Sequence, residues 1–132
     1  MRAWKMGVLV MGLGAGFAPL AGCQTPGEPG RYNTMTGNYS GTFDASLEKV
    51  HEATLSAMKE LGYNVSRDTM NTGTGDKAEV VVRDAAHHDI EIRMKRTTDQ
   101  VTELTIGQGA FTGSESRARL MFDRIRSHLM MP

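Results

Sequence analysis

Two stretches of the chain carry apolar residues at the three- and four-residue spacing of an amphipathic helix. The first lies between Asp44, a residue type that caps helices, and Gly62, a residue type that ends them in the left-handed conformation. Its apolar positions are Leu47, Val50, Thr54, Ala57, Met58 and Leu61. The second follows Ser114, and its apolar positions are Ala118, Met121, Phe122, Ile125 and Leu129. We expect one helix in each stretch.

Strand patterns, in which apolar and polar residues alternate, occur before and between these helices. The alternation over residues 35–43 is loose because Gly37 and Gly41 interrupt it, and residues 63–67 form a short second candidate. Three better strands carry apolar residues on one side: Ala78, Val80 and Val82; Ile90, Ile92 and Met94; Thr102, Leu104 and Ile106. Turn residues at 84–87 and 97–100 separate these three.

The resulting order is strand, helix, three or four strands, helix. Two helices with one apolar stripe each can cover a sheet with one apolar face only by packing together on that face. The pattern therefore predicts an α+β fold of two layers: a mostly antiparallel sheet of four to five strands with two helices on one face. The length suits a single domain over residues 35–132.

The first 22 residues have a different character. Arg2 and Lys5 precede an apolar run over residues 6–20, which is shorter than the roughly 20 residues of a membrane-spanning helix and is interrupted by glycines. A basic start and a short apolar run that ends in small residues are typical of an export signal. The run closes on Leu20-Ala21-Gly22-Cys23, which resembles the lipobox of bacterial lipoproteins. The resemblance implies removal of residues 1–22 and acylation of Cys23, the chain's only cysteine.

Acyl chains on Cys23 would attach the protein stably to a membrane, because one chain binds only reversibly and two or three do not dissociate readily. Gln24, in place of aspartate, resembles the outer-membrane sorting pattern of Gram-negative lipoproteins. Residues 23–34 are rich in proline and glycine and predict a tether. We expect a lipid-anchored envelope protein, facing the periplasm from the outer membrane, with another envelope protein as candidate partner.

Further segments resemble a known family. They are residues 44–50, 53–55, 60–63, 109–113 and 124–129. They resemble a family of small bacterial lipoproteins that is classed as domain of unknown function 3568. The matching positions are chiefly packing residues and helix caps, so the resemblance implies the fold and the location but no catalytic residue.

The charge balance gives no reason to expect a nucleic-acid partner, which normally requires a basic patch. Removing Arg2 and Lys5 from the 15 basic residues leaves 13, against 15 acidic residues. The glycine-rich residues 107–113 lie between a predicted strand and a helix, but no strand pattern follows that helix, as a dinucleotide site would need. We expect a close turn there and no cofactor.

Metal and catalytic motifs are weak. His87, His88, Asp89 and Glu91 lie on an extended segment whose neighbouring side chains point to opposite faces, so we expect a polar hairpin tip rather than a metal site. Methionines near His128 are of the type that binds Cu(I), whereas Met58, Met94 and Met121 occupy predicted core positions. The serines and histidines form no nucleophile motif. We expect no catalytic residue and no metal.

The last helix offers a candidate partner surface. Its arginines at positions 117, 119, 124 and 126 are either a solvated helix face or a docking surface for an acidic partner or anionic headgroups, formed by Arg117, Arg124 and Arg126. The expected role is non-enzymatic binding or scaffolding, through this helix or through the exposed sheet face. The alternatives are a carrier with an apolar ligand between helices and sheet, and an enzyme with an unrecognised site.

Overall fold

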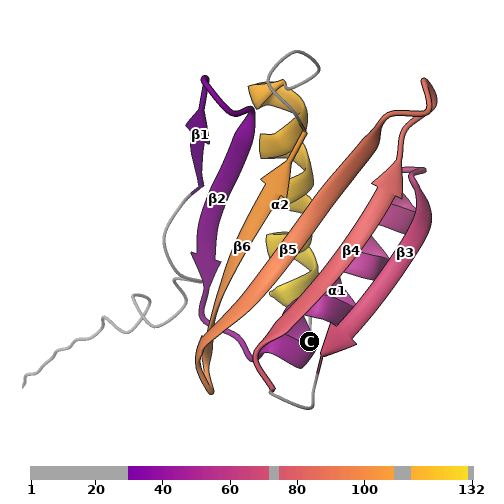
Figure 1. Cartoon of the computed structure of the whole chain (residues 1–132). Helices are drawn as coiled ribbons and strands as arrows, with labels where there is room; N and C mark the ends of the chain where they lie inside the picture. Colours follow the sequence, from indigo (N-terminus) through magenta and orange to yellow (C-terminus); the bar gives the residue numbers. More distant parts are fainter. Residues whose placement is uncertain (1–29, 72–74, 109–113, 131–132) are drawn as a thin grey trace, which may run out of the picture.

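The sheet and its two helices lie within residues 30–71, 75–108 and 114–130, the ranges that the computed structural model describes. Six antiparallel strands pair in the order β1-β2-β6-β5-β4-β3. The elements are β1 Arg31–Asn33, β2 Asn38–Phe43, α1 Leu47–Glu60, β3 Asn64–Asn71, β4 Lys77–Arg83, β5 Asp89–Thr98, β6 Val101–Gly107 and α2 Glu115–Leu129. Both helices pack on the same face of the sheet, which confirms the predicted two-layer α+β arrangement (Figure 1).

The expected four to five strands were too few. The additional strand is β1, which falls in the stretch expected to be tether and pairs with β2 through Tyr32 opposite Tyr39. The hairpin turn depends on Asn33, whose side-chain oxygen accepts from the backbone N–H groups of Met35 and Thr36, and on Gly37, whose φ is 75°. A strand of three residues is too short for an alternating pattern to reveal it.

The ends of the helices follow local hydrogen bonding. Ser46, rather than the predicted Asp44, caps α1, and its hydroxyl oxygen accepts from the N–H of Lys49 at 3.3 Å. Gly62 follows α1 with φ of 85°, the left-handed conformation expected there. Ser114 caps α2 as predicted and accepts from the N–H of Arg117 at 3.2 Å.

The core lies between the helices and the sheet. It includes the predicted sulfur-containing residues Met58, Met94 and Met121, each almost fully buried. The Phe122 ring of α2 stacks on Phe43 with 4.6 Å between ring centroids. It also lies directly over Gly41 of β2, where a Cβ atom would come within 2.5 Å of the ring. Gly41, which weakens the strand pattern, is therefore what lets α2 approach the sheet so closely.

Candidate binding face

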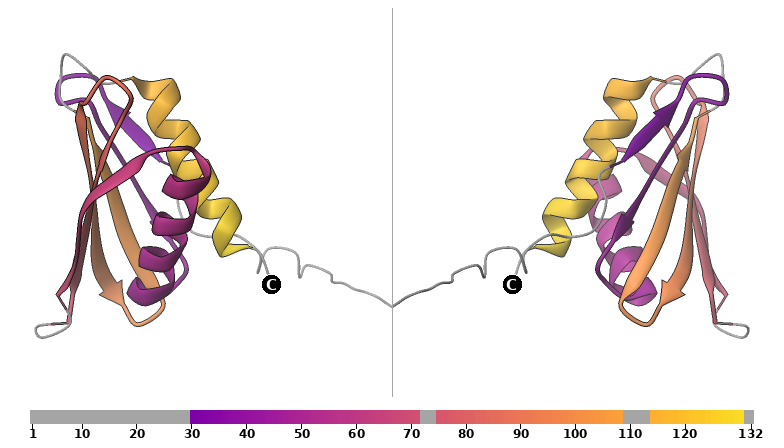
Figure 2. Two further views of the ribbon diagram at one scale, coloured as in Figure 1. Left: turned by 90° about the vertical axis from the view of Figure 1, so that its right-hand side faces the viewer. Right: turned by 90° about the vertical axis from the view of Figure 1, so that its left-hand side faces the viewer.

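Neither of the two described helices covers the second face of the sheet, as the side views show (Figure 2). Its side chains form rows across the strands because the antiparallel register of β5 with β4 and with β6 is regular over residues 89–96. One row runs Lys77, Lys95, Glu103, Thr42, and the next runs Thr69, Glu79, Arg93, Thr105, Ser40. We call this surface, formed by the outward-facing residues of β2 to β6, the open face.

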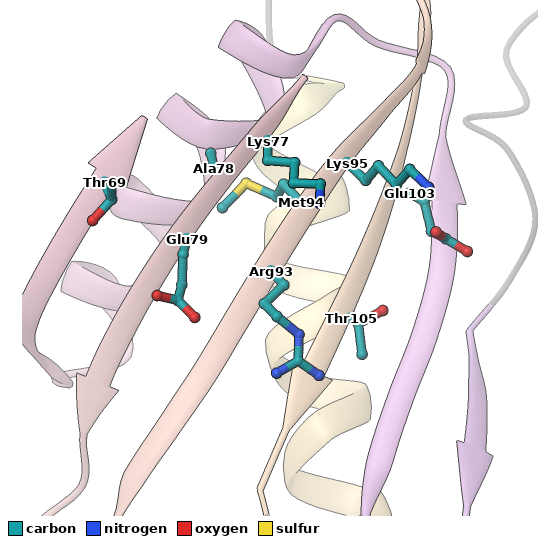
Figure 3. Close-up of a pocket in the computed structure, with 9 residues that line it drawn as sticks. All are labelled: Thr69, Lys77, Ala78, Glu79, Arg93, Met94, Lys95, Glu103 and Thr105. Carbon is teal, nitrogen blue, oxygen red and sulfur yellow. The ribbon is translucent and has the colours of Figure 1, made fainter. Parts of the chain in front are cut away.

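A hollow of about 430 Å³ lies on the open face. The outward-facing side chains around it come from four strands, β3 to β6 (Figure 3). Its charged members are Lys77, Glu79, Arg93, Lys95 and Glu103. The outward-facing residues of the described strands include no aromatic ring, because Tyr32, Tyr39 and Phe43 are on the helix side or in the core. The hollow thus offers charged side chains but no ring for stacking on sugars or bases.

The arginines of the open face are paired with carboxylates. Arg67 lies 3.0 Å from Glu79, Arg93 lies 2.9 Å from Glu91, and a third pair joins Arg83 to Asp89 at 3.1 Å. These pairs are exposed, so each contributes at most about 1 kcal/mol to stability. By contrast, no ion pair within 4.0 Å joins Lys77, Lys95 or Glu103 to another described residue. Their charges are available to a ligand.

The candidate arginine surface of α2 is largely occupied by contacts within the domain. Arg117 donates to Gln108 at 2.7 Å and to Asp84 at 3.0 Å. Arg124 donates to Glu60 of α1 at 3.2 Å. That carboxylate also forms a hydrogen bond with His128, and these neighbours, His128 first, hold the pKa of Glu60 below its usual value. Arg124 and Glu60 therefore join the two helices, and Arg124 is not simply a solvated charge.

Arg126 has a different environment. Its guanidinium lies over the Phe122 ring, 5.2 Å from the centroid, and 3.5 Å from the Asp123 carboxylate. Its Nε atom is buried without a hydrogen-bond partner in the described part of the chain. A partner surface at Arg117, Arg124 and Arg126 stays a prediction, but binding there would compete with contacts that hold α2 in place.

Asp84 is the centre of a polar network at the end of the domain where the β4–β5 hairpin meets α2. Its side chain is 12% exposed and accepts from the backbone N–H groups of His88 and Ala86, both at 2.9 Å, and from Arg117. The hydrogen bond from His88, followed by the one from Ala86, holds the pKa of Asp84 below its usual value although partial burial opposes this. The network fixes the hairpin, where His87 has φ of 67°, against the start of α2.

This network predicts an acid-sensitive contribution to stability. Because folding lowers the pKa of Asp84, its contribution is present above the ordinary aspartate pKa of about 3.9 and is lost as the pH falls through the lower folded value. We expect Asp84→Asn to unfold at lower urea concentration than wild type at pH 7. The difference should shrink as the pH falls below about 4. Asp99→Asn, in the exposed β5–β6 turn, is the control and should match wild type at both pH values.

The histidines and carboxylates of the β4–β5 hairpin do not gather. His88 lies 3.5 Å from Asp84, whereas Asp89 and Glu91 pair with Arg83 and Arg93. Over residues 30–71, 75–108 and 114–130, no three His, Cys, Asp or Glu side chains are grouped so as to hold a metal ion. Cys23, residues 109–113 of the turn predicted at 107–113, and Met131 lie outside the described residues.

A family model described as "Protein of unknown function (DUF3568)" matches residues 9–128. The chain belongs to the DUF3568 family. No curated protein matches it. Neither helix of the described DUF3568 domain is long and apolar enough to cross a membrane.

Sequence reasoning missed the two unpaired lysines of the open face. Lys77 and Lys95 are far apart in the chain and meet only through the β4–β5 register. The apolar alternation of the two strands did contain a signal for this pairing. The apolar residues of β4 and β5 must face the same way: Ala78, Val80 and Val82 on β4, and Ile90, Ile92 and Met94 on β5. That condition allows Lys77 and Lys95 to lie opposite one another on the other face, and the register of the folded hairpin places them so.

Proposed function

We propose that this protein is a lipid-anchored, non-enzymatic envelope protein that binds another envelope component through the open face of its sheet. The anchor is Cys23 at the lipobox-like site, on the periplasmic side of the outer membrane. The observation that carries the proposal is the asymmetry of the domain. One sheet face is sealed by two helices, and the other presents a charged hollow.

The point at which the anchored segment joins the domain supports an orientation in which the open face is turned away from the membrane. Gly30, the first described residue, contacts the Tyr39 ring, which belongs to the core on the helix side of the sheet. Six residues, 24–29, separate it from Cys23, and at about 3.6 Å per step the seven steps from Cys23 to Gly30 span at most about 25 Å. A chain held at this point keeps the domain near the bilayer while its open face lies on the side away from the attachment.

The interior is less suited to a ligand than the open face. Side chains from both helices and the central strands fill the space between the layers, and the largest of them are fully buried: Phe43, Phe122, Leu47, Met58, Ile90, Ile92, Leu104, Ile106, Met121 and Ile125. An apolar carrier would have to displace such residues. The open face offers a hollow that needs no rearrangement.

Photo-crosslinking in intact cells tests the binding face. A photoreactive residue is placed at Glu103, inside the hollow, and in a matched chain at Lys49, which is exposed on α1. We expect illumination to give a discrete adduct, seen by intact-mass spectrometry and gel electrophoresis, from position 103 and not from position 49. An adduct from position 49 alone would move the binding surface to the helices.

A further inference from the structure

We propose that the hollow of the open face binds a soluble molecule through a phosphate monoester held between Lys77 and Lys95. This rests on the proposed use of the open face and names the chemistry that it recognises. The inference comes from the pairing of two like charges in the sheet, from the lack of described partners for them, and from the charge that would balance them.

Lys77 and Lys95 are register partners on the neighbouring strands β4 and β5. Residues opposite one another in an antiparallel pair have Cβ atoms about 5 Å apart, and like charges in that arrangement destabilise the sheet. Both side chains are exposed on the open face and reach the hollow (Figure 3). The sheet thus keeps a repulsive pair at a position where one acidic residue would have given an attractive one.

The surroundings neutralise the pair only in part, because Glu103 lies opposite Lys95 on β6 but no acidic residue lies opposite Lys77 on β3. Arg67, Arg83 and Arg93 on the same face each have a carboxylate within 3.1 Å. Among the described residues, neither lysine has a carboxylate within 4.0 Å. An oxyanion placed between the two ammonium groups would convert the repulsion into two charge-assisted hydrogen bonds, the stronger class of hydrogen bond in proteins.

Charge favours a doubly charged anion. A phosphate monoester carries about −1.5 to −2 charge at pH 7, so the two ammonium groups attract it more strongly than a singly charged carboxylate, even with Glu103 beside Lys95. Lysine binds phosphate well as a point charge. Thr69 and Thr105 also line the hollow and add hydroxyl groups beside the lysines.

Two carboxylates limit where the phosphate can lie. Glu79 is already bound by Arg67. Glu103 is the register partner of Lys95 on β6, on the side away from Lys77, and would repel an anion placed over it. The phosphate is therefore confined to the β4–β5 side, and Glu103 can accept a hydrogen bond from a hydroxyl group of the ligand's organic part. The ligand is soluble rather than a lipid headgroup, because the open face lies away from the attachment at Gly30.

Equilibrium dialysis against radiolabelled glycerol 3-phosphate tests the proposal. The full chain is used in mild detergent, which keeps acylated and non-acylated protein equally in solution. We expect saturable binding with a dissociation constant below about 1 mM. Lys77→Gln and Lys95→Gln should each weaken it about tenfold or more, because each removes one charged hydrogen bond. Lys49→Gln on α1 removes the same charge elsewhere and should leave binding unchanged.

Stability separates a binding effect from misfolding. Lys77→Gln removes only the like-charge repulsion, so it should unfold at the same or a higher urea concentration than wild type. Lys95→Gln removes that repulsion together with the attraction to Glu103, so its unfolding midpoint should stay close to that of wild type. The proposal is overturned if wild type shows no saturable binding, or if both lysine variants bind as well as wild type. Micelles doped with phosphatidic acid test whether the phosphate belongs to a lipid headgroup. Strong competition by this lipid with glycerol 3-phosphate would refute the proposal that the ligand is soluble. If wild type binds no glycerol 3-phosphate but still gives the photo-crosslinked adduct at position 103, only the phosphate proposal is refuted. If wild type gives neither, the open face is refuted as a binding surface.

Discussion

In cells supplied with labelled palmitate, the wild-type chain should become labelled and sediment with the membranes, whereas Cys23→Ala should do neither. The reason is that Cys23 is the only thiol in the chain that could carry a thioether-linked lipid. Each buried CH₂ group adds about 0.8 kcal/mol to membrane attachment, so the loss of several acyl chains is an all-or-none change. Fluorography of the purified chain and fractionation of the cells measure the two effects.

The matched control is Ser116→Ala, an exposed change on α2, which should keep both the label and the membrane fraction. Intact-mass spectrometry should show that the wild-type product begins at Cys23. A wild-type chain that retains residues 1–22, or that carries a free thiol, would end the lipoprotein interpretation.

Replacement of Gly41 by alanine should lower the free energy of unfolding by about 2 kcal/mol, although alanine normally suits a strand better than glycine. The added methyl group would lie 2.5 Å from Cζ and 2.8 Å from Cε2 of the Phe122 ring. That ring cannot easily retreat, because it stacks on Phe43 and contacts Tyr39 with 5.4 Å between centroids. Urea unfolding followed by circular dichroism measures the change.

Gly107→Ala makes the same substitution on the opposite face of the sheet and should change stability by less than about 0.5 kcal/mol. The atoms nearest to its methyl group would be side-chain atoms of Asn38 at 3.3 Å and Arg93 at 3.7 Å and a backbone oxygen at 3.7 Å, so no contact is as close as the one at Gly41. Adding Phe122→Leu to Gly41→Ala should recover part of the loss, since the two positions are in contact. Equal stability of Gly41→Ala and wild type would show that α2 is free to shift.

Much of the fold could be predicted because its signals are periodic. The apolar spacing of both helices and the alternation around Val80, Ile92 and Leu104 are visible in the sequence and place these residues in the core. The misjudged details depend on single contacts. Asp44 and Ser46 are both capping residue types, and only the hydrogen bond to Lys49 identifies Ser46 as the cap.

The candidate site was harder to predict because it depends on register and tertiary pairing. Nothing local distinguishes Lys77 and Lys95 from other solvated lysines until the strands are aligned. Likewise, the sequence suggests a basic surface on α2, but Arg117 and Arg124 find their carboxylates on a distant hairpin and on α1. Whether a charge is free or engaged is decided by residues tens of positions away.

Folding protects the methionine sulfur atoms of the core from oxidants, because it buries them. Met58, Met94 and Met121 are sealed inside, whereas Met35 and Met130 are 86% and 59% exposed. Peroxide should therefore convert the two outer thioethers to sulfoxides first, with little effect on the fold. A sulfoxide on any of the inner three is polar and would not fit between the layers. A chain oxidised at these residues while unfolded could not pack this core again, so that even brief unfolding in the presence of peroxide would become permanent.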